Sequence, residues 1–315
     1  MFDYYCVLGY DLLVTPREII ARAWAITRKQ RGVRWWGYTS SFFETLLHLK
    51  MLIYQTYFFW SFMIAGNTIG FFEIEEIIYR SVPFPVFATV MTLIVVLLIV
   101  EFFIPSFCLG AVIGLGAKAH REEEVNGGWI LGLYNFFPLF VVREIAVLSS
   151  VSLAVTLSSL IFRYGGSPDM VGFLLVALWF LWLFSVVLKF LICFSEEAIV
   201  IRKVGMFTAM GMSFKLVLSH LSKIVFLLVL LFVISLRIVI NAAMALLLPA
   251  LIIGFAFLFS TFLSATVTTV LTGLIAIILV ALSSYLFAYL EVFKQTAWTI
   301  TFLELSKLKE LDVIE

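Results

Sequence analysis

The sequence predicts an all-α fold, a polytopic transmembrane helical bundle with about six spans. Of its 315 residues, 63% are hydrophobic and only 13% are charged. The mean hydropathy is +1.13, and the apolar residues gather in stretches long enough to cross a bilayer. A water-soluble chain of this length would need many more polar side chains to cover its surface, so lipid is the expected solvent.

Six apolar stretches have the length of a membrane span. A helix rises about 1.5 Å per residue, so crossing the hydrocarbon core takes about 20 mostly apolar residues. We expect spans at approximately 51–72, 84–107, 140–162, 170–194, 224–246 and 266–292. These runs are continuous and lack the alternation of barrel strands, so helices are the predicted spanning structure.

The region from 224 to 292 leaves the number of crossings open. Arg237 is its only charged residue before Glu291, and Pro249 and Gly254 interrupt it. A third crossing here would place the basic residues of the C-terminal segment outside, against the positive-inside rule. We therefore prefer two spans, with the segment from Leu247 to Ser264 as a re-entrant or outer-facing apolar helix; a seventh span is the alternative.

Basic residues indicate the orientation. They cluster before the first span and after each even-numbered one: Arg17, Arg22, Arg28, Lys29, Arg31, Arg34 and Lys50; Lys118, Arg121 and Arg143; Arg202, Lys203, Lys215 and Lys223; Lys294, Lys307 and Lys309. The first loop on the other side carries Glu73, Glu75 and Glu76. By the positive-inside rule we expect a multi-pass protein of the cell membrane with both termini cytoplasmic.

The segments before the odd-numbered spans resemble one another. Ser41, Phe42, Leu46, His48 and Leu49 recur as Ser213, Phe214, Leu218, His220 and Leu221, shifted by 172. A shift of 77 places Gly128, Phe137, Leu139 and Arg143 opposite Gly205, Phe214, Leu216 and His220. We therefore expect one membrane domain, 1–315, with three pseudo-repeats at approximately 15–116, 117–195 and 196–315. Each would join an amphipathic cytoplasmic helix to a membrane hairpin.

The third repeat shows the amphipathic pattern most clearly. Met206, Phe207, Met210 and Phe214 recur at three- and four-residue spacing, which is typical of a helix face that lies on a bilayer or packs against a partner. We take these four residues as a candidate interaction face. Gly128 with Gly132, and Gly205 with Ala209, form small-xxx-small pairs that favour close helix packing.

Residues 196–232, EEAIVIRKVGMFTAMGMSFKLVLSHLSKIVFLLVLLF, resemble the polytopic membrane domain fused to some glycerophosphodiester phosphodiesterases and found in related, largely uncharacterised prokaryotic membrane proteins. Residues 297–307, AWTITFLELSK, resemble that family's C-terminal run. The resemblance implies six helices and cytoplasmic termini. It implies no catalytic residues, because the fused enzymes carry their chemistry on a separate soluble domain and this chain has no segment left to form one.

Three ionisable residues in or at the ends of the predicted spans form a candidate intramembrane polar site, because charges at membrane depth are energetically costly. They are Glu101, Lys189 and Glu291. In equivalent repeats, Glu101 and Lys189 would lie at one depth and could pair. The alternative is that these side chains reach the cytoplasmic interface individually.

Other chemistry has no clear signature. His120 stands beside Glu122, Glu123 and Glu124 on an expected solvated loop, which is weak evidence for a metal site. The three cysteines, Cys6, Cys108 and Cys193, are far apart, and no nucleotide-binding or hydrolase motif occurs. We predict no enzyme, no cofactor and no metal, and the net charge of +1 gives no reason to expect a nucleic-acid partner.

The leading hypothesis is a non-enzymatic membrane protein that organises or handles lipid, or serves as a membrane subunit of a larger assembly. Its partners would be membrane lipids and a further protein or a second copy bound through the cytoplasmic amphipathic helices. The alternative is a small-solute or lipid transporter with a path near Glu101 and Lys189. A transporter should have a polar cavity that reaches one of these residues, whereas a scaffold should have a dry core and an apolar or basic cytoplasmic face.

Overall fold

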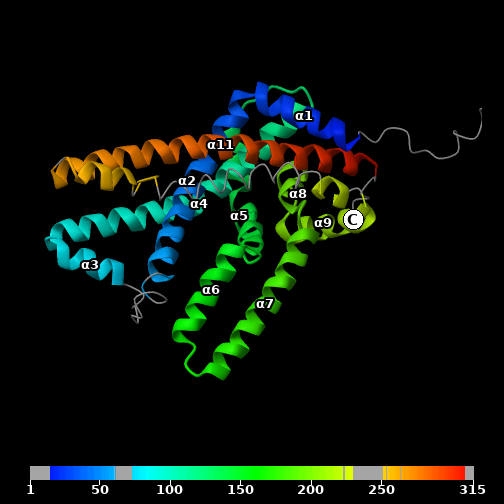
Figure 1. Ribbon diagram of the computed structural model, residues 1–315. Helices are drawn as coiled ribbons and strands as arrows, with labels where there is room; N and C mark the ends of the chain where they lie inside the picture. Colours follow the sequence, from blue (N-terminus) through cyan, green and yellow to red (C-terminus); the bar gives the residue numbers. More distant parts are fainter. Residues whose placement is uncertain are drawn as a thin grey trace, which may run out of the picture.

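The computed structural model describes residues 15–59, 61, 73–222, 224–229, 251–252, 254–262 and 264–308. Throughout this part of the chain the secondary structure is helical, with turns between helices and no strand, which confirms the predicted all-α class. The helices pack against one another in a central body, and apolar helical segments project from this body in two directions (Figure 1).

Four helices form the centre of the body. α4 (Phe84–His120) packs against both α2 (Arg31–Phe59) and α5 (Gly128–Val147), and α11 (Ala265–Leu308) packs along α2 and α4. α1 (Pro16–Lys29) begins with a capping box between Thr15 and Glu18 and lies across α11. The short helices α8 (Ser195–Arg202) and α9 (Met206–Ser219) pack on each other and on α5.

The two longest helices have one exposed part and one buried part. In α4, Leu93, Val96 and Ile99 are exposed, whereas the stretch from Gly110 to Ala117 is buried. In α11, exposed apolar residues such as Ile277 give way to a C-terminal part that is mostly buried. Large exposed apolar surfaces are unfavourable in water, so these projecting parts fit a lipid environment.

Three helical stretches are long and apolar enough to cross a membrane, judged by length and composition: Phe84–His120, Gly128–Val147 and Pro168–Arg202. Shorter apolar helices run over Leu153–Phe162, Met206–Ser219 and Val270–Leu282. These helices support the prediction of a membrane protein. The expected spans at 51–72 and 224–246 lie largely outside the described residues, as does part of the segment from Leu247 to Ser264, so the number of crossings stays a prediction.

The expected span at 140–162 is interrupted in the structure. α5 ends at Val147, and α6 (Val151–Tyr164) begins after a turn. The Ser150 hydroxyl accepts a hydrogen bond from Leu153 N at 3.3 Å and caps α6, while Trp182 Nε1 donates to the Ser149 carbonyl at 3.1 Å. The two serines therefore end one helix and begin another within an apolar run. α6 pairs with α7 (Pro168–Leu191), and both extend away from the body (Figure 1).

Glycines of α4 and α5 allow these two helices to approach closely, and Gly128 of α5 makes room for Trp36 of α2. A Cβ added at Gly132 would lie 2.7 Å from the Phe107 carbonyl oxygen, and one at Gly128 would overlap the Trp36 ring. Gly110 of α4 faces Gly132 across this contact. The predicted packing role of Gly128 and Gly132 is thereby confirmed. Gly205 differs, because a Cβ there would meet no atom within 4 Å among the described residues.

Candidate functional site

Glu101 is buried in α4, one turn before Pro105, and is 1% exposed. Its carboxylate accepts a hydrogen bond from Lys50 Nζ at 2.6 Å. Pairing with Lys189 was one of two possibilities that the sequence left open, and the structure instead pairs Glu101 with Lys50, because α2 packs along α4 and brings the start of the predicted first span beside it. The buried charge of Glu101 is thus neutralised within the first hairpin.

Lys189 and Glu291 line a common cavity of about 310 Å³, which we call the charged cavity. It lies where residues of α2, α4, α5, α7, α8 and α11 meet. Its polar lining consists of Ser40, Glu44, Arg143, Ser150, Lys189, Glu196, Glu291 and Gln295. Two of the three candidate polar residues therefore come together, while Glu101 does not line this cavity.

Two ion pairs stabilise the wall of the charged cavity. The Arg143 guanidinium of α5 donates to the Glu44 carboxylate of α2, and both side chains are about three-quarters buried. Lys294 Nζ lies 3.1 Å from Glu291 Oε2, one turn along α11. Arg143 and Lys189 both act electrostatically on Glu196 and Glu291. The cavity thus holds charges of both signs at close range.

A second space of about 360 Å³, the apolar cavity, adjoins the first. The two share Ala146, Lys189, Glu196 and Gln295 as lining residues. The rest of the apolar cavity is lined by Val142, Val186, Phe190, Ile192, Cys193, Glu197, Leu228 and Trp298. Glu197, 1% exposed, accepts a hydrogen bond from Gln295 Nε2 at 2.9 Å through Oε1. No donor among the described residues reaches its Oε2.

The candidate interaction face on α9 divides in two. Phe207 is 77% exposed and Phe214 47% exposed. Met206 and Met210 are partly buried and pack against the main core cluster, which includes Ala209, Leu216 and Val217. The two methionines of this face therefore pack against the core, and the two phenylalanines are exposed.

The same repeat position is exposed on three helices. Trp35 of α2, Ile130 of α5 and Phe207 of α9 are related by the predicted shifts, and they are 67%, 73% and 77% exposed. Two residues further on, Gly37, Gly132 and Ala209 are all small and all buried. On α5 the exposed face continues through Trp129, Leu133, Tyr134 and Phe137. Each helix therefore has small residues inward at this point and large apolar residues outward.

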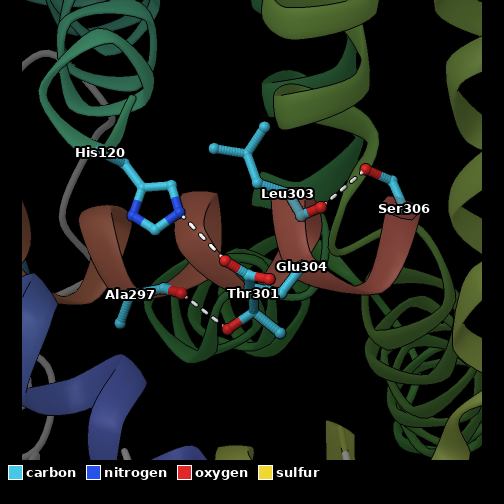
Figure 2. Close-up of polar contacts among 6 residues, drawn as sticks. All are labelled: His120, Ala297, Thr301, Leu303, Glu304 and Ser306. Atoms are coloured by element: carbon cyan, nitrogen blue, oxygen red, sulfur yellow. Dashed lines mark hydrogen bonds and ion pairs between the residues drawn. The ribbon is translucent and has the colours of Figure 1, made fainter. Parts of the chain in front are cut away.

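His120 does not lie on a solvated loop, as the sequence had led us to expect. It ends α4, and its Nε2 lies 3.1 Å from Glu304 Oε1 on α11, with only 9% and 11% of the two side chains exposed (Figure 2). Glu304 follows Thr301, whose hydroxyl donates to the Ala297 carbonyl at 2.7 Å (Figure 2). The pair joins the ends of the two longest helices. Among the described residues, no three His, Cys, Asp or Glu side chains are grouped as a metal site would require.

Comparison of the chain with models of protein families, with curated protein sequences and with solved structures finds no match.

Four residues of the charged cavity were not among the candidate site residues predicted from the sequence: Glu44, Arg143, Glu196 and Gln295. Arg143 and His220 occupy the same position of the predicted repeat, as does His48, and Glu44 lies one turn before His48. This recurrence of polar residues next to the spans was the available signal. Their convergence depends on how α2, α5 and α11 pack, which a linear sequence does not specify.

Proposed function

We propose that this chain is a non-enzymatic, multi-pass protein of the cell membrane that organises or handles lipid, alone or as a membrane subunit of a larger assembly. Six spans, three pseudo-repeats and cytoplasmic termini are part of the proposal. The helices that precede the membrane hairpins would lie at the cytoplasmic surface of the bilayer. By analogy, the resemblance of residues 196–232 to membrane domains fused to phosphodiesterases of lipid-derived substrates agrees with this role.

The observation that carries the proposal is the shared exposure of Trp35, Ile130 and Phe207. Aromatic and large aliphatic side chains on one face of a helix, with small residues on the opposite face, suit a position at the headgroup boundary. Three such helices, each followed by apolar structure, would hold the body against one leaflet.

Basic residues on α1 favour the same placement. Arg17, Arg22, Arg28 and Lys29 are exposed, while Ile19, Ala23 and Thr27 face inward. Each basic side chain near an anionic leaflet contributes about 1 kcal/mol of attraction. The exposed side of α1 therefore matches the charge of the cytoplasmic surface.

The test is a depth measurement on the full chain in lipid nanodiscs. Single cysteines at Trp35, Ile130 and Phe207 would carry an environment-sensitive fluorophore, quenched by nitroxides at known depths in the lipid or by iodide in water. Glu123, on the exposed turn after α4, is the aqueous control, and Phe180, 75% exposed on α7, is the deep control. We expect quenching of the three test positions by headgroup-level nitroxides. If all three instead respond to iodide as Glu123 does, the proposal is wrong.

Transport is the second candidate, and the charged cavity favours it, because a polar space reaches Lys189. In this case Lys189→Met should abolish flux of small solutes or lipid in reconstituted vesicles, whereas Lys215→Met, on the exposed side of α9, should not. Unchanged flux in the Lys189 variant would exclude this path.

A further inference from the structure

The charged and apolar cavities together have the polarity profile of an amphipathic ligand. They meet at Lys189, Glu196 and Gln295, with ion pairs on one side and Val186, Phe190 and Trp298 on the other. Their volumes of about 310 and 360 Å³ each reach the lower end of the range of about 300–1,000 Å³ typical of small-molecule sites. One molecule with a charged end and an apolar end would occupy both.

Pairing within the site leaves one charge of each sign available. Arg143 is bound to Glu44, and Glu291 is bound to Lys294. Within the part of the chain that the structure describes, neither Lys189 nor Glu196 is in a direct ion pair. Both line both cavities. An ammonium and a carboxylate placed together in this way complement a zwitterion.

Glu197 adds an independent indication of the ligand. It is 1% exposed and lines the apolar cavity, and its Oε2 has no hydrogen-bond donor among the described residues. A buried carboxylate oxygen without a donor is energetically unfavourable. A ligand N–H group would satisfy it.

The position of Lys189 places the mouth of the site at the edge of the hydrocarbon. Lys189 is exposed in the last turn of α7. Directly before it, Leu183, Phe184 and Val187 are exposed apolar residues that fit contact with lipid tails. A lysine that ends an apolar helix reaches headgroup depth. A membrane lipid could therefore reach the site sideways from its own leaflet.

We infer that the two cavities bind a glycerophospholipid whose headgroup carries a primary amine, as in phosphatidylethanolamine. Lys189 contacts the phosphate, Glu196 and Glu197 accept hydrogen bonds from the ammonium, and one acyl chain enters the apolar cavity. A primary ammonium can donate three hydrogen bonds and so can bind carboxylates directly. A quaternary ammonium donates none and is typically bound by aromatic cages. This inference rests on the proposed lipid role and specifies its ligand class.

The experiment measures binding of fluorescent phosphatidylethanolamine, phosphatidylcholine and phosphatidylglycerol to the delipidated full chain in detergent. We expect ethanolamine lipid to bind at least roughly tenfold more tightly than the other two, the effect of one or two charge-assisted hydrogen bonds. Lys189→Met should weaken all three lipids about tenfold, since it removes the phosphate contact. Glu196→Gln should abolish the preference for ethanolamine without weakening phosphatidylglycerol.

Lys215→Met is the matched control, because it removes an exposed lysine that lines neither cavity. Equal binding of the three lipids to the unmodified chain would overturn the inference, as would loss of affinity in the Lys215 variant equal to that in the Lys189 variant. Free phosphoethanolamine is added as a competitor. Competition as strong as that of the intact lipid would also overturn the inference, because the apolar cavity would then contribute nothing.

The two proposals fail separately. If the depth measurements place Trp35, Ile130 and Phe207 at the headgroups and the three lipids bind equally, the lipid site fails and the membrane-surface role stands. If ethanolamine preference depends on Lys189 and Glu196 while the three helices lie in water, the surface role fails and the site stands.

Discussion

Lys50 of α2 forms an ion pair with the fully buried side chain of Glu101 of α4, with 2.6 Å between Nζ and Oε2. The Lys50 side chain is 27% exposed, so one end of the pair reaches the surface. Burying a carboxylate without a partner is strongly unfavourable. The pair therefore fixes the register of the first hairpin at the point where α4 passes from its exposed part to its buried part.

We predict that Lys50→Met lowers the free energy of unfolding by about 3–5 kcal/mol, because it leaves Glu101 buried and uncompensated. Thermal or denaturant unfolding of the detergent-solubilised chain would measure this. The double variant Lys50→Met with Glu101→Met should recover most of the loss, since two apolar residues can replace a buried pair. Arg80→Met is the control, because its pair with Glu76 is exposed. A Lys50 variant as stable as the Arg80 variant would contradict the prediction.

We predict that Gly132→Ala destabilises the chain by about 1–3 kcal/mol, because overpacking would force α4 and α5 apart. Its Cβ would stand 2.7 Å from a backbone oxygen, which cannot rotate away as a side chain can. Gly211→Ala is the matched control within another helix, where a Cβ meets no described atom within 4 Å. That substitution should stabilise α9 by about 0.5–1 kcal/mol through helix propensity. The unfolding midpoints of the two variants test both expectations. A Gly132→Ala variant that is as stable as the Gly211→Ala variant would refute the close contact.

We predict an energetic coupling of about 0.5–3 kcal/mol between His120 and Glu304, measured by a double-mutant cycle with alanine at each position. The two side chains are nearly buried and join the ends of α4 and α11. The adjacent pair of Arg121 with Glu123 is half exposed, with 3.8 Å between the charged groups, and should show almost no coupling. A His120 cycle no larger than this neighbouring one would mean that the contact does not hold the helices together.

The sequence was sufficient for features that depend on local pattern. Apolar length predicts the helices, and the spacing of Gly128 and Gly132 predicts a close contact, which Phe107 and Trp36 provide. Ser213 entered the sequence analysis only as part of the predicted repeat, and its role in the structure was not predicted: it is buried and links α9 to the turn between α7 and α8. Its hydroxyl accepts from Phe194 N at 3.0 Å and donates to the Leu191 carbonyl at 2.9 Å.

Features that depend on helix crossing divide into two kinds. Lys50 and Glu101 stand at the same end of a predicted hairpin, so their pairing could have been predicted once the spans were assigned, whereas contacts between different hairpins could not. Arg143 and Glu44 belong to different predicted repeats, and only the packing around α4 brings them together. The break at Ser150 was also missed, because hydropathy records an apolar run and not the hydroxyl that caps a new helix.

The two ends of α4 are expected to lie on opposite sides of the membrane. We predict that α3 (Glu73–Ser81) lies outside the cell and Arg202, at the end of α8, inside, because in the proposed topology α4 and the α7–α8 segment each return the chain to the side rich in basic residues. Cysteine at Glu76 or Arg202, both exposed, would be introduced after the native cysteines are replaced by alanine. An impermeant maleimide should label position 76 on intact cells and position 202 only after permeabilisation. A cysteine at Glu123 should behave as position 202 does. Labelling of 76 and 202 from the same face would remove the alternating topology, and with it the placement of Lys189 and its cavities at the cytoplasmic leaflet.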